Sequence, residues 1–145
     1  MKITTKQIYL GVLILVVVYV IYKSGILNPK AQPPIDSVKN AKDGSTPSHQ
    51  SGGAEYESIA TSIYNTFTDN WLLWNNTEAI TVLERLNGMN DADLIEVSNA
   101  FNVKFAGKTP STLKATLQGE YLTFWSNQAD TLRDEVVKRL TGLNA

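Results

Sequence analysis

The longest apolar run in the chain, Ile8 to Tyr22, constrains its fold more than any other feature. Its fifteen consecutive positions carry no charge, and the uncharged stretch continues to Leu27 with only Lys23 intervening. Twenty helical residues extend about 30 Å, which matches the hydrocarbon core of a bilayer, whereas fifteen reach only about 22 Å. The run therefore predicts a single transmembrane helix within residues 1–27, with Lys23 extending to the lipid headgroups. The side chains expected to contact lipid are Ile8, Leu10, Leu13, Ile14, Val17, Val20 and Ile21.

Two alternatives stay open for this run. Lys2 and Lys6 precede it as in a cleaved secretory signal, but Tyr22 or Lys23 would stand where cleavage requires a small residue. The run could also be a buried core helix. Because Lys2, Lys6 and the amino terminus flank one side against Lys23 and Lys30 on the other, a slight bias of positive charge places the amino terminus in the cytoplasm.

Residues 28–53 are predicted to form a flexible linker. They contain four of the five prolines, end in Ser51-Gly52-Gly53 and show no apolar periodicity. A flexible chain of this length has a reach of about 28 Å. The single histidine, His49, lies in this segment and is expected to be solvated, because catalysis or metal binding needs positioned partners.

Charge and cysteine content exclude several classes of function. Residues 1–53 carry six lysines against two acids, for a net charge of +4, whereas residues 54–145 carry seven basic and twelve acidic residues, for −5. An acidic domain repels nucleic acid, so a nucleic-acid partner is not expected. The absence of cysteine excludes disulfides, thiolate nucleophiles and cysteine-based metal sites.

From Ala54 onward, apolar residues recur with a period of about 3.6, which predicts an all-α domain over residues 54–145. No segment shows the sustained alternation of a strand. Five short helices are expected. The first places Tyr56, Ile59, Ile63, Tyr64 and Phe67 on one face. The others run from Asn75, Asn76 or Thr77 to Gly88, from about Asn90 or Asp91 to Gly107, from Thr109 and Pro110 onward, and from about Gln128 to Leu143.

The order of residues from Ser58 to Trp125 resembles one annexin-type repeat, a module of five short helices. Three stretches carry the resemblance: Thr77 to Leu83, Asn99-Ala100-Phe101 running to Phe105 and Gly107, and Leu113 to Gly119. The tail from Asp130 to Asn144 is similar to the opening helix of a further repeat. The resemblance implies a small annexin-repeat-like domain, although an annexin core has four repeats.

The family's calcium-dependent membrane binding is not carried over to this chain. It requires a Gly-x-Gly-Thr loop and a carboxylate from the fourth helix. Here Trp74 and Asn76 take the two glycine positions, only Thr77 agrees, and Thr116 takes the carboxylate position. Calcium needs six to eight oxygen ligands with carboxylates among them, so no metal and no cofactor is predicted.

A cluster of four bulky apolar residues, Trp71, Leu72, Leu73 and Trp74, occupies that loop. Tryptophan favours both bilayer interfaces and protein interfaces, so this segment is a candidate contact for a partner or for lipid. Packing back onto the domain core as a lid is the third possibility.

The last helix is a candidate oligomer face. Leu132, Val136 and Leu140 align on one side of it, and an incomplete repeat can leave such a face for a second copy of the chain. The same face could instead be covered within the domain.

No catalytic constellation is found. The chain lacks a Gly-x-Ser-x-Gly motif, a phosphate-binding loop and a His-Glu-x-x-His motif. Paired catalytic carboxylates need a cleft, and the acidic pairs are expected at helix starts or on solvated outer faces instead. These pairs are Glu55 with Glu57, Asp91 with Asp93, and Asp134 with Glu135. The sequence therefore predicts no catalytic residue and no enzyme.

The sequence as a whole predicts a single-pass, membrane-anchored structural or interaction protein. Membrane lipid is the expected partner of the N-terminal helix, and a protein partner or a second copy is the expected partner of the helical domain. A bacterial inner-membrane adaptor and a minor membrane protein of a bacteriophage virion with an internal lipid layer both suit this layout. The alternative is a membrane-active effector that contacts lipid through Trp71 to Trp74.

Overall fold

The computed structural model describes residues 32–68, 76–108, 110–119 and 127–145, all within one compact unit, Ala31–Ala145. These residues form six helices and no strand, so the all-α prediction is confirmed for the described part of the chain. In chain order the helices are α2 (Ser37–Asn40), α3 (Ala54–Thr68), α4 (Asn76–Gly88), α5 (Asp91–Lys104), α6 (Leu113–Gly119) and α7 (Asn127–Leu143).

The architecture expected from the sequence, a transmembrane helix followed by a flexible linker and a five-helix domain, is wrong as a whole. Of its three parts, the helical domain agrees with the structure, because α3 to α7 lie within the described part of residues 54–145. Within the described ranges, none of the helices combines the length and the apolar composition that crossing a membrane requires. The expected anchor residues, Ile8 to Ile21, lie outside those ranges. Most of the expected linker is instead a structured segment that contains α2, because its polar groups hydrogen-bond to side chains of α5.

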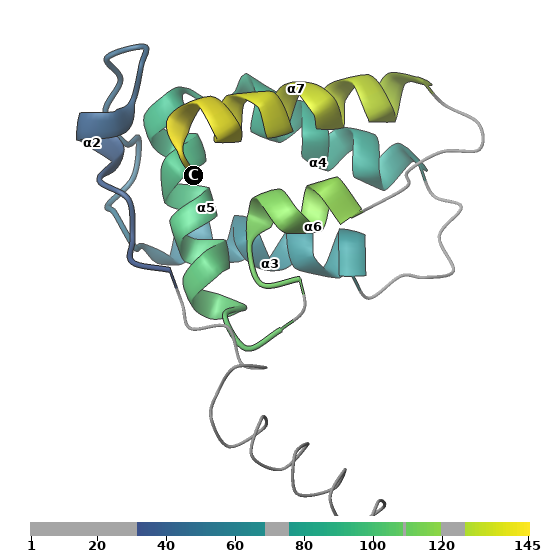
Figure 1. Cartoon of the computed structure of the whole chain (residues 1–145), viewed down its shortest axis with the longest axis horizontal. Coiled ribbons are helices and arrows are strands. Elements are labelled where there is room, and N and C mark those ends of the chain that lie inside the picture. Colours follow the sequence, from purple (N-terminus) through teal and green to yellow (C-terminus); the bar gives the residue numbers. More distant parts are fainter. Residues whose placement is uncertain (1–31, 69–75, 109, 120–126) are drawn as a thin grey trace, which may run out of the picture. The chain divides into compact units, whose positions relative to one another are not determined.

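Four of the helices form two pairs, and α5 contacts both pairs. α4 and α7 lie side by side along one edge of the unit, while α3 and α6 lie along the other (Figure 1). α5 runs across one end of this arrangement and contacts α3, α6 and α7, and α2 lies on its outer side. The central helix is therefore covered from several directions.

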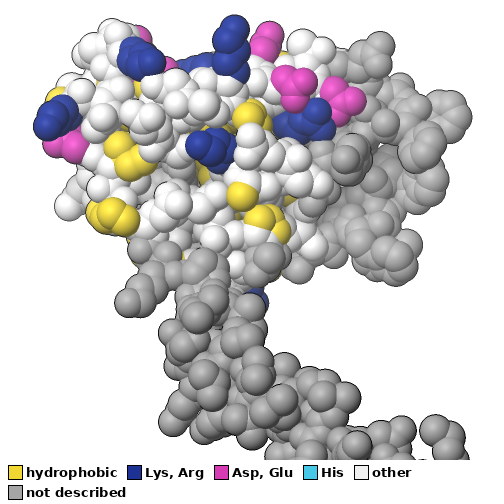
Figure 2. Space-filling view, in the orientation of Figure 1, with side chains coloured by type: hydrophobic (Ala, Val, Ile, Leu, Met, Phe, Trp, Pro, Cys, Tyr) yellow, Lys and Arg dark blue, Asp and Glu magenta, His cyan; other side chains and the backbone are white. Residues whose placement is uncertain are grey.

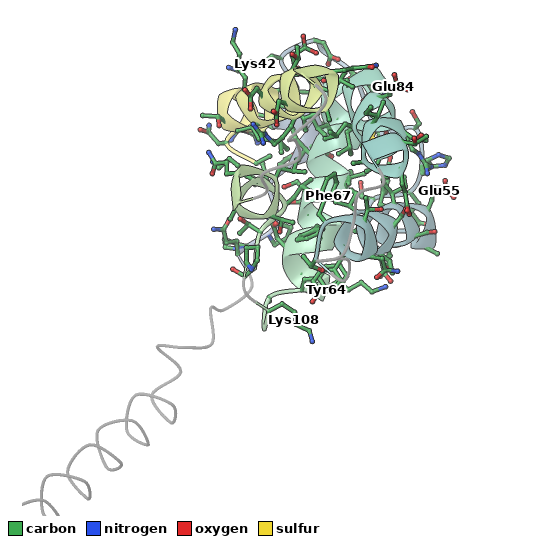
Figure 3. All side chains as sticks on the ribbon, turned by 90° about the vertical axis from the view of Figure 1, so that its right-hand side faces the viewer. Lys42, Glu55, Tyr64, Phe67, Glu84 and Lys108 are labelled. Carbon is green, nitrogen blue, oxygen red and sulfur yellow. The ribbon has the colours of Figure 1, made fainter. Side chains whose placement is uncertain are left out.

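Burial follows this arrangement. On α3, the period of 3.6 places Tyr56, Ile59, Ile63 and Phe67 on the buried face, as the sequence predicts. Phe67 points inward between the helices, whereas Lys42 and Lys108 point outward at opposite ends of the unit (Figure 3). α5 differs, because ten of its fourteen residues are buried and these are distributed around the helix. Such all-round burial is typical of a central helix.

An aromatic cluster joins α3 to the end of α5. The ring of Tyr64 stacks on that of Phe105 with 4.1 Å between centroids, and Phe101 packs against Phe105 at 4.9 Å. Aromatic pairs in offset or tilted arrangements add about 0.5–1.5 kcal/mol beyond the area they bury. The cluster therefore packs α3 against the end of α5.

Polar caps define two of the helix ends. The Asn90 side chain accepts a hydrogen bond from the Asp93 amide at 2.8 Å and begins α5 where the sequence predicts. At the end of α7, Asn144 has a φ of 58° and the Ala145 amide donates to the Leu140 carbonyl at 2.9 Å. This pattern is a Schellman motif, which satisfies carbonyls of the last helical turn.

The start of α6 differs from the prediction. Pro110 lies outside the helix, and Thr112 is the residue whose hydroxyl accepts from the Ala115 amide, at 3.1 Å. The Leu113 amide donates to the side-chain oxygen of Asn102 at 3.0 Å. Because both contacts satisfy amides at the beginning of the helix, α6 starts at Leu113 rather than at Pro110.

Candidate functional site

The segment formed by residues 32–53, here called the strap, contacts α5 from Asp91 to Asn99. Its first part runs toward the start of α5, where the Lys42 amide donates to Asp91 at 3.2 Å and Asp43 accepts from the Asp91 amide at 3.0 Å. Its second part returns along the helix, with the Gly52 amide donating to Glu96 at 3.3 Å. Gly52 has a φ of 69°, which suits glycine at the turn into α3. The strap thus builds one wall of the site.

Asn99 holds the beginning of the strap. Its side-chain oxygen accepts from the Ile35 amide at 2.8 Å, and its side-chain NH₂ donates to the Ile35 carbonyl at 2.7 Å. Ser37 follows, with its hydroxyl donating to Glu96 at 2.6 Å. One amide side chain therefore pairs both backbone groups of a residue 64 positions away, as a neighbouring strand would.

Asp93 holds the end of the strap. Its carboxylate accepts from the Ser48 amide at 2.7 Å, from the Ser48 hydroxyl at 2.6 Å and from the Tyr56 hydroxyl at 2.5 Å. Burial alone would raise the pKa of Asp93, but the hydrogen bonds from Ser48 and Tyr56 outweigh it and lower the pKa below its ordinary value. Asp93 is therefore a structural carboxylate that stays ionised.

Tyr56 connects the strap to α3. Its buried hydroxyl also accepts from the His49 amide at 3.1 Å, and the His49 ring meets its ring edge to face, with 5.7 Å between centroids. Burial, together with the hydrogen bond to Asp93, raises the pKa of Tyr56 to about 12. A tyrosine with so high a pKa is a poor proton donor, so this group serves to position the strap.

The sequence-based interpretation of these residues needs correction. Asp91 and Asp93 are not solvated surface acids: Asp93 is buried, and Asp91 accepts from the strap and pairs with Arg139 at 2.9 Å. His49 is exposed, as expected, but it is positioned by its contacts with Tyr56. A signal was present in the sequence, because the apolar residues of this helix fall on several sides and do not form a single apolar face.

A groove of about 640 Å³ lies where the strap runs beside the second half of α5. Its apolar side chains are Pro34, Ile35 and Val38 from the strap with Ala100 and Val103 from α5. Val38 and Val103 are 57% and 55% exposed, and no other large hydrophobic residue in the described ranges is comparably exposed. On the face shown in Figure 2, hydrophobic side chains form small separate patches between polar and charged ones. The groove therefore combines a depression with the most exposed apolar side chains.

The groove is acidic. Asp36, Glu57 and Glu96 line it together with Lys104, so three carboxylates against one ammonium leave a net charge of −2. The Lys104 ammonium lies 3.9 Å from the Glu57 carboxylate and faces that acid. Glu96 is only 6% exposed and is bound by the strap.

A second hollow, of about 520 Å³, has Tyr56, His49, Asp93 and Arg85 among its lining residues. The Tyr56 hydroxyl donates a hydrogen bond to Asp93, and the Arg85 guanidinium forms an ion pair with Glu55 at 3.4 Å. Among the described residues, no cluster of three or more His, Asp or Glu side chains could hold a metal ion. The polar groups of this hollow are used to hold the strap and α3.

The candidate oligomer face on α7 is not exposed. Val136 and Leu140 are fully buried in the core of the chain, and Leu132 is half-buried against it. Their inward position follows from the packing of α7 along α4 and against α5 and α6. Of the two possibilities that the sequence left open, coverage within the domain is the arrangement seen.

The candidate contact residues Trp71, Leu72, Leu73 and Trp74 lie outside the described residues, so their role stays a prediction. At the position that corresponds to the annexin carboxylate, Thr116 is fully buried and its hydroxyl donates to the Thr112 carbonyl at 2.9 Å. This hydroxyl is engaged in a helix contact and faces away from solvent.

Neither models of known protein families, nor curated proteins, nor solved structures gave a match to this chain. The annexin resemblance therefore stays a prediction. Function has to be argued from the groove and from the segment that forms it.

Proposed function

We propose that the unit Ala31–Ala145 is a non-enzymatic interaction domain that binds a protein partner in the groove between the strap and α5. The exposure of Val38 and Val103 at this groove is the observation that carries the proposal. Valine side chains more than half exposed beside a depression offer apolar area that a docking segment removes from water, worth about 25 cal/mol per Å².

The chemistry of the polar groups supports binding rather than catalysis. Asp93 and Tyr56 engage each other and the strap, and Glu96 is held by Ser37 and Gly52. A general acid or base needs a pKa near the working pH, whereas the pKa of Tyr56 is raised to about 12 and that of Asp93 is lowered. These groups hold the shape of the site.

The setting stays a prediction. A membrane location, in a bacterial envelope or in a virion, was inferred from the apolar run Ile8 to Tyr22, which lies outside the described residues. The interaction proposed here does not depend on that location. Contact with lipid through Trp71 to Trp74 is the competing function.

Site-specific photo-cross-linking of the full-length protein tests the proposal. A photo-reactive amino acid is placed at Val103 or at Val38, and as a control at Lys138, which is exposed on α7. Irradiation in the native host should give the same protein adduct from both groove positions and not from position 138. Introducing Val103→Asp into the chain labelled at Val38 should reduce that adduct at least tenfold. Adducts with lipid only, or equal protein adducts from all three positions, would overturn the proposal.

A further inference from the structure

Glu96 is a buried carboxylate that forms no ion pair with any described residue. It is 6% exposed, and its two oxygens accept only from neutral donors, the Ser37 hydroxyl at 2.6 Å and the Gly52 amide at 3.3 Å. None of the ion pairs found between described residues includes it. Burying a charge costs free energy unless the charge is paired. A cation on a ligand would therefore gain binding free energy by pairing with this carboxylate.

Glu96 lines the groove although it is only slightly exposed to solvent. A carboxylate has about four lone-pair sites, and the strap uses two of them. Lys104, the one basic residue of the groove, lies 3.9 Å from Glu57 instead. The remaining negative charge of the groove therefore faces whatever occupies it, and an acidic segment would be repelled.

The positions along α5 set the spacing of a ligand. Glu96, Ala100 and Val103 are related by i, i+4 and i+7, so they lie on one side of the helix. At about 1.5 Å per residue, Glu96 and Val103 are separated by about 10 Å along the axis. A peptide that covers Val103 with an apolar side chain would therefore present its cation about 10 Å away.

We infer that the partner docks through a short segment that combines apolar side chains with a Lys or Arg, and that this cation pairs with Glu96. The inference rests on the proposed function, since it names the chemistry of the partner for the same groove. The apolar side chains cover Val38 and Val103, and the cation supplies the charge that Glu96 lacks within the described part of the chain. A charge-assisted contact of this kind gives the groove its selectivity.

A library of random twelve-residue peptides displayed on phage, selected on the full-length protein, provides the probe. The enriched peptides should contain at least one Lys or Arg together with apolar residues. Their affinity, measured by fluorescence anisotropy, should fall about tenfold for Glu96→Gln, which keeps an oxygen that accepts from Ser37. Glu84→Gln is the matched control, because Glu84 is an exposed acid of α4 outside the groove and its substitution changes the net charge equally.

A double-mutant cycle isolates the pair. Replacing the basic residue of the peptide by citrulline or norleucine should also cost about tenfold with the native protein, and almost nothing more with Glu96→Gln. Hydrogen exchange would show whether Glu96→Gln releases the strap. If it does, the test of the ion pair is the affinity of the native protein for the peptide whose basic residue has been replaced. An affinity unchanged by that replacement would overturn the inference.

Failure of the inference and failure of the proposed function give different results. Val103→Lys places a cation on an exposed position of α5 without disturbing the core, and it should weaken every groove-binding peptide at least tenfold. Some peptides could lose affinity with Val103→Lys but not with Glu96→Gln or on loss of their own basic residue. This result would support the docking groove and overturn the inferred ion pair with Glu96. Peptides indifferent to both protein variants would overturn the groove itself.

Discussion

At the scale of single residues, polar side chains of α5 hold the strap in place. Asp93 accepts three hydrogen bonds, two from Ser48 and one from Tyr56, and it does so as a charged group. Hydrogen bonds to charged groups contribute about 1.5–3 kcal/mol each, more than neutral ones. The strap is thus held by a few strong contacts rather than by a large apolar area.

Substitution of Asp93 should expose this dependence on charge. At pH 7 we expect Asp93→Asn to lower the free energy of unfolding by about 2 kcal/mol, because the neutral amide keeps only one acceptor oxygen and the donors of Ser48 and Tyr56 lose their charged partner. The pKa of Asp93 is lowered in the folded state, so its contribution is present above the unfolded value of about 3.9 and is lost as the pH falls through the folded value. Urea denaturation from pH 7 to pH 3 should therefore show the two proteins converging in acid.

The matched control is Asp134→Asn, at an acid whose side chain is 70% exposed on α7. This variant should differ from the native protein by no more than about 0.5 kcal/mol throughout the pH range. A constant gap for Asp93→Asn down to pH 3 would contradict the assignment of Asp93 as an ionised acceptor.

At the scale of elements, the strap is the least local part of the fold. Its contacts with α5 span 44 to 64 positions of sequence, so no local pattern in residues 32–53 announces them. Asn99 is the contact that begins the strap, and its two hydrogen bonds to Ile35 can be removed together. The stability of the strap can therefore be tested separately from that of the bundle.

We expect Asn99→Ala to increase amide hydrogen exchange in residues 35–41 about tenfold or more. Loss of two hydrogen bonds weakens local closure by about 1.4 kcal/mol or more, which corresponds to that factor. Exchange in α4 and α7 should stay as in the native protein.

Asn87→Ala serves as the control for this prediction, since Asn87 bonds across α4 and α7 to Glu135 at 2.9 Å, away from the strap. It should leave exchange in residues 35–41 unchanged. Equal acceleration by both variants would mean that the strap opens only with the whole unit.

Elements whose signals are local could be read from the sequence, whereas those fixed by distant partners could not. The period of α3 and the Asn90 cap of α5 are local, and both were predicted. The strap was predicted to be a linker because its composition contains few apolar residues that could pack into a core. It is held instead by hydrogen bonds to carboxylates and an amide side chain on α5, which its own sequence does not reveal. Its wall of the groove, and with it the candidate site, was missed for the same reason.

At the scale of the whole molecule, Arg139 joins three helices. From α7 its guanidinium donates to the carbonyls of Asn87 and Met89, both at 2.9 Å, and to the carboxylate of Asp91 at 2.9 Å. The carbonyls belong to the end of α4 and the turn that follows, and Asp91 begins α5. Local spacing in the sequence cannot reveal this contact, because Arg139 binds the end of a different helix.

Arg139→Met should therefore destabilise the fold by about 2–3 kcal/mol in chemical denaturation, since it leaves the α4–α5 turn without a donor and Asp91 without its cation. Arg85→Met is the comparison, because Arg85 is exposed and pairs only loosely with Glu55 at 3.4 Å. That change should cost less than about 0.5 kcal/mol. Similar losses for the two variants would argue against a joining role for Arg139.

The all-round burial of α5 has a consequence for the tolerance of the chain to substitution. A helix on the edge of a bundle accepts polar replacements on its outer side, so a map of every single substitution shows tolerated positions recurring every three or four residues. We expect this spacing of tolerated positions along α4 and α7. Along α5, intolerant positions should instead follow one another from Ala92 to Asn99, because the core lies on one side and the strap on the other. In such a map the central helix would stand out as an unbroken block.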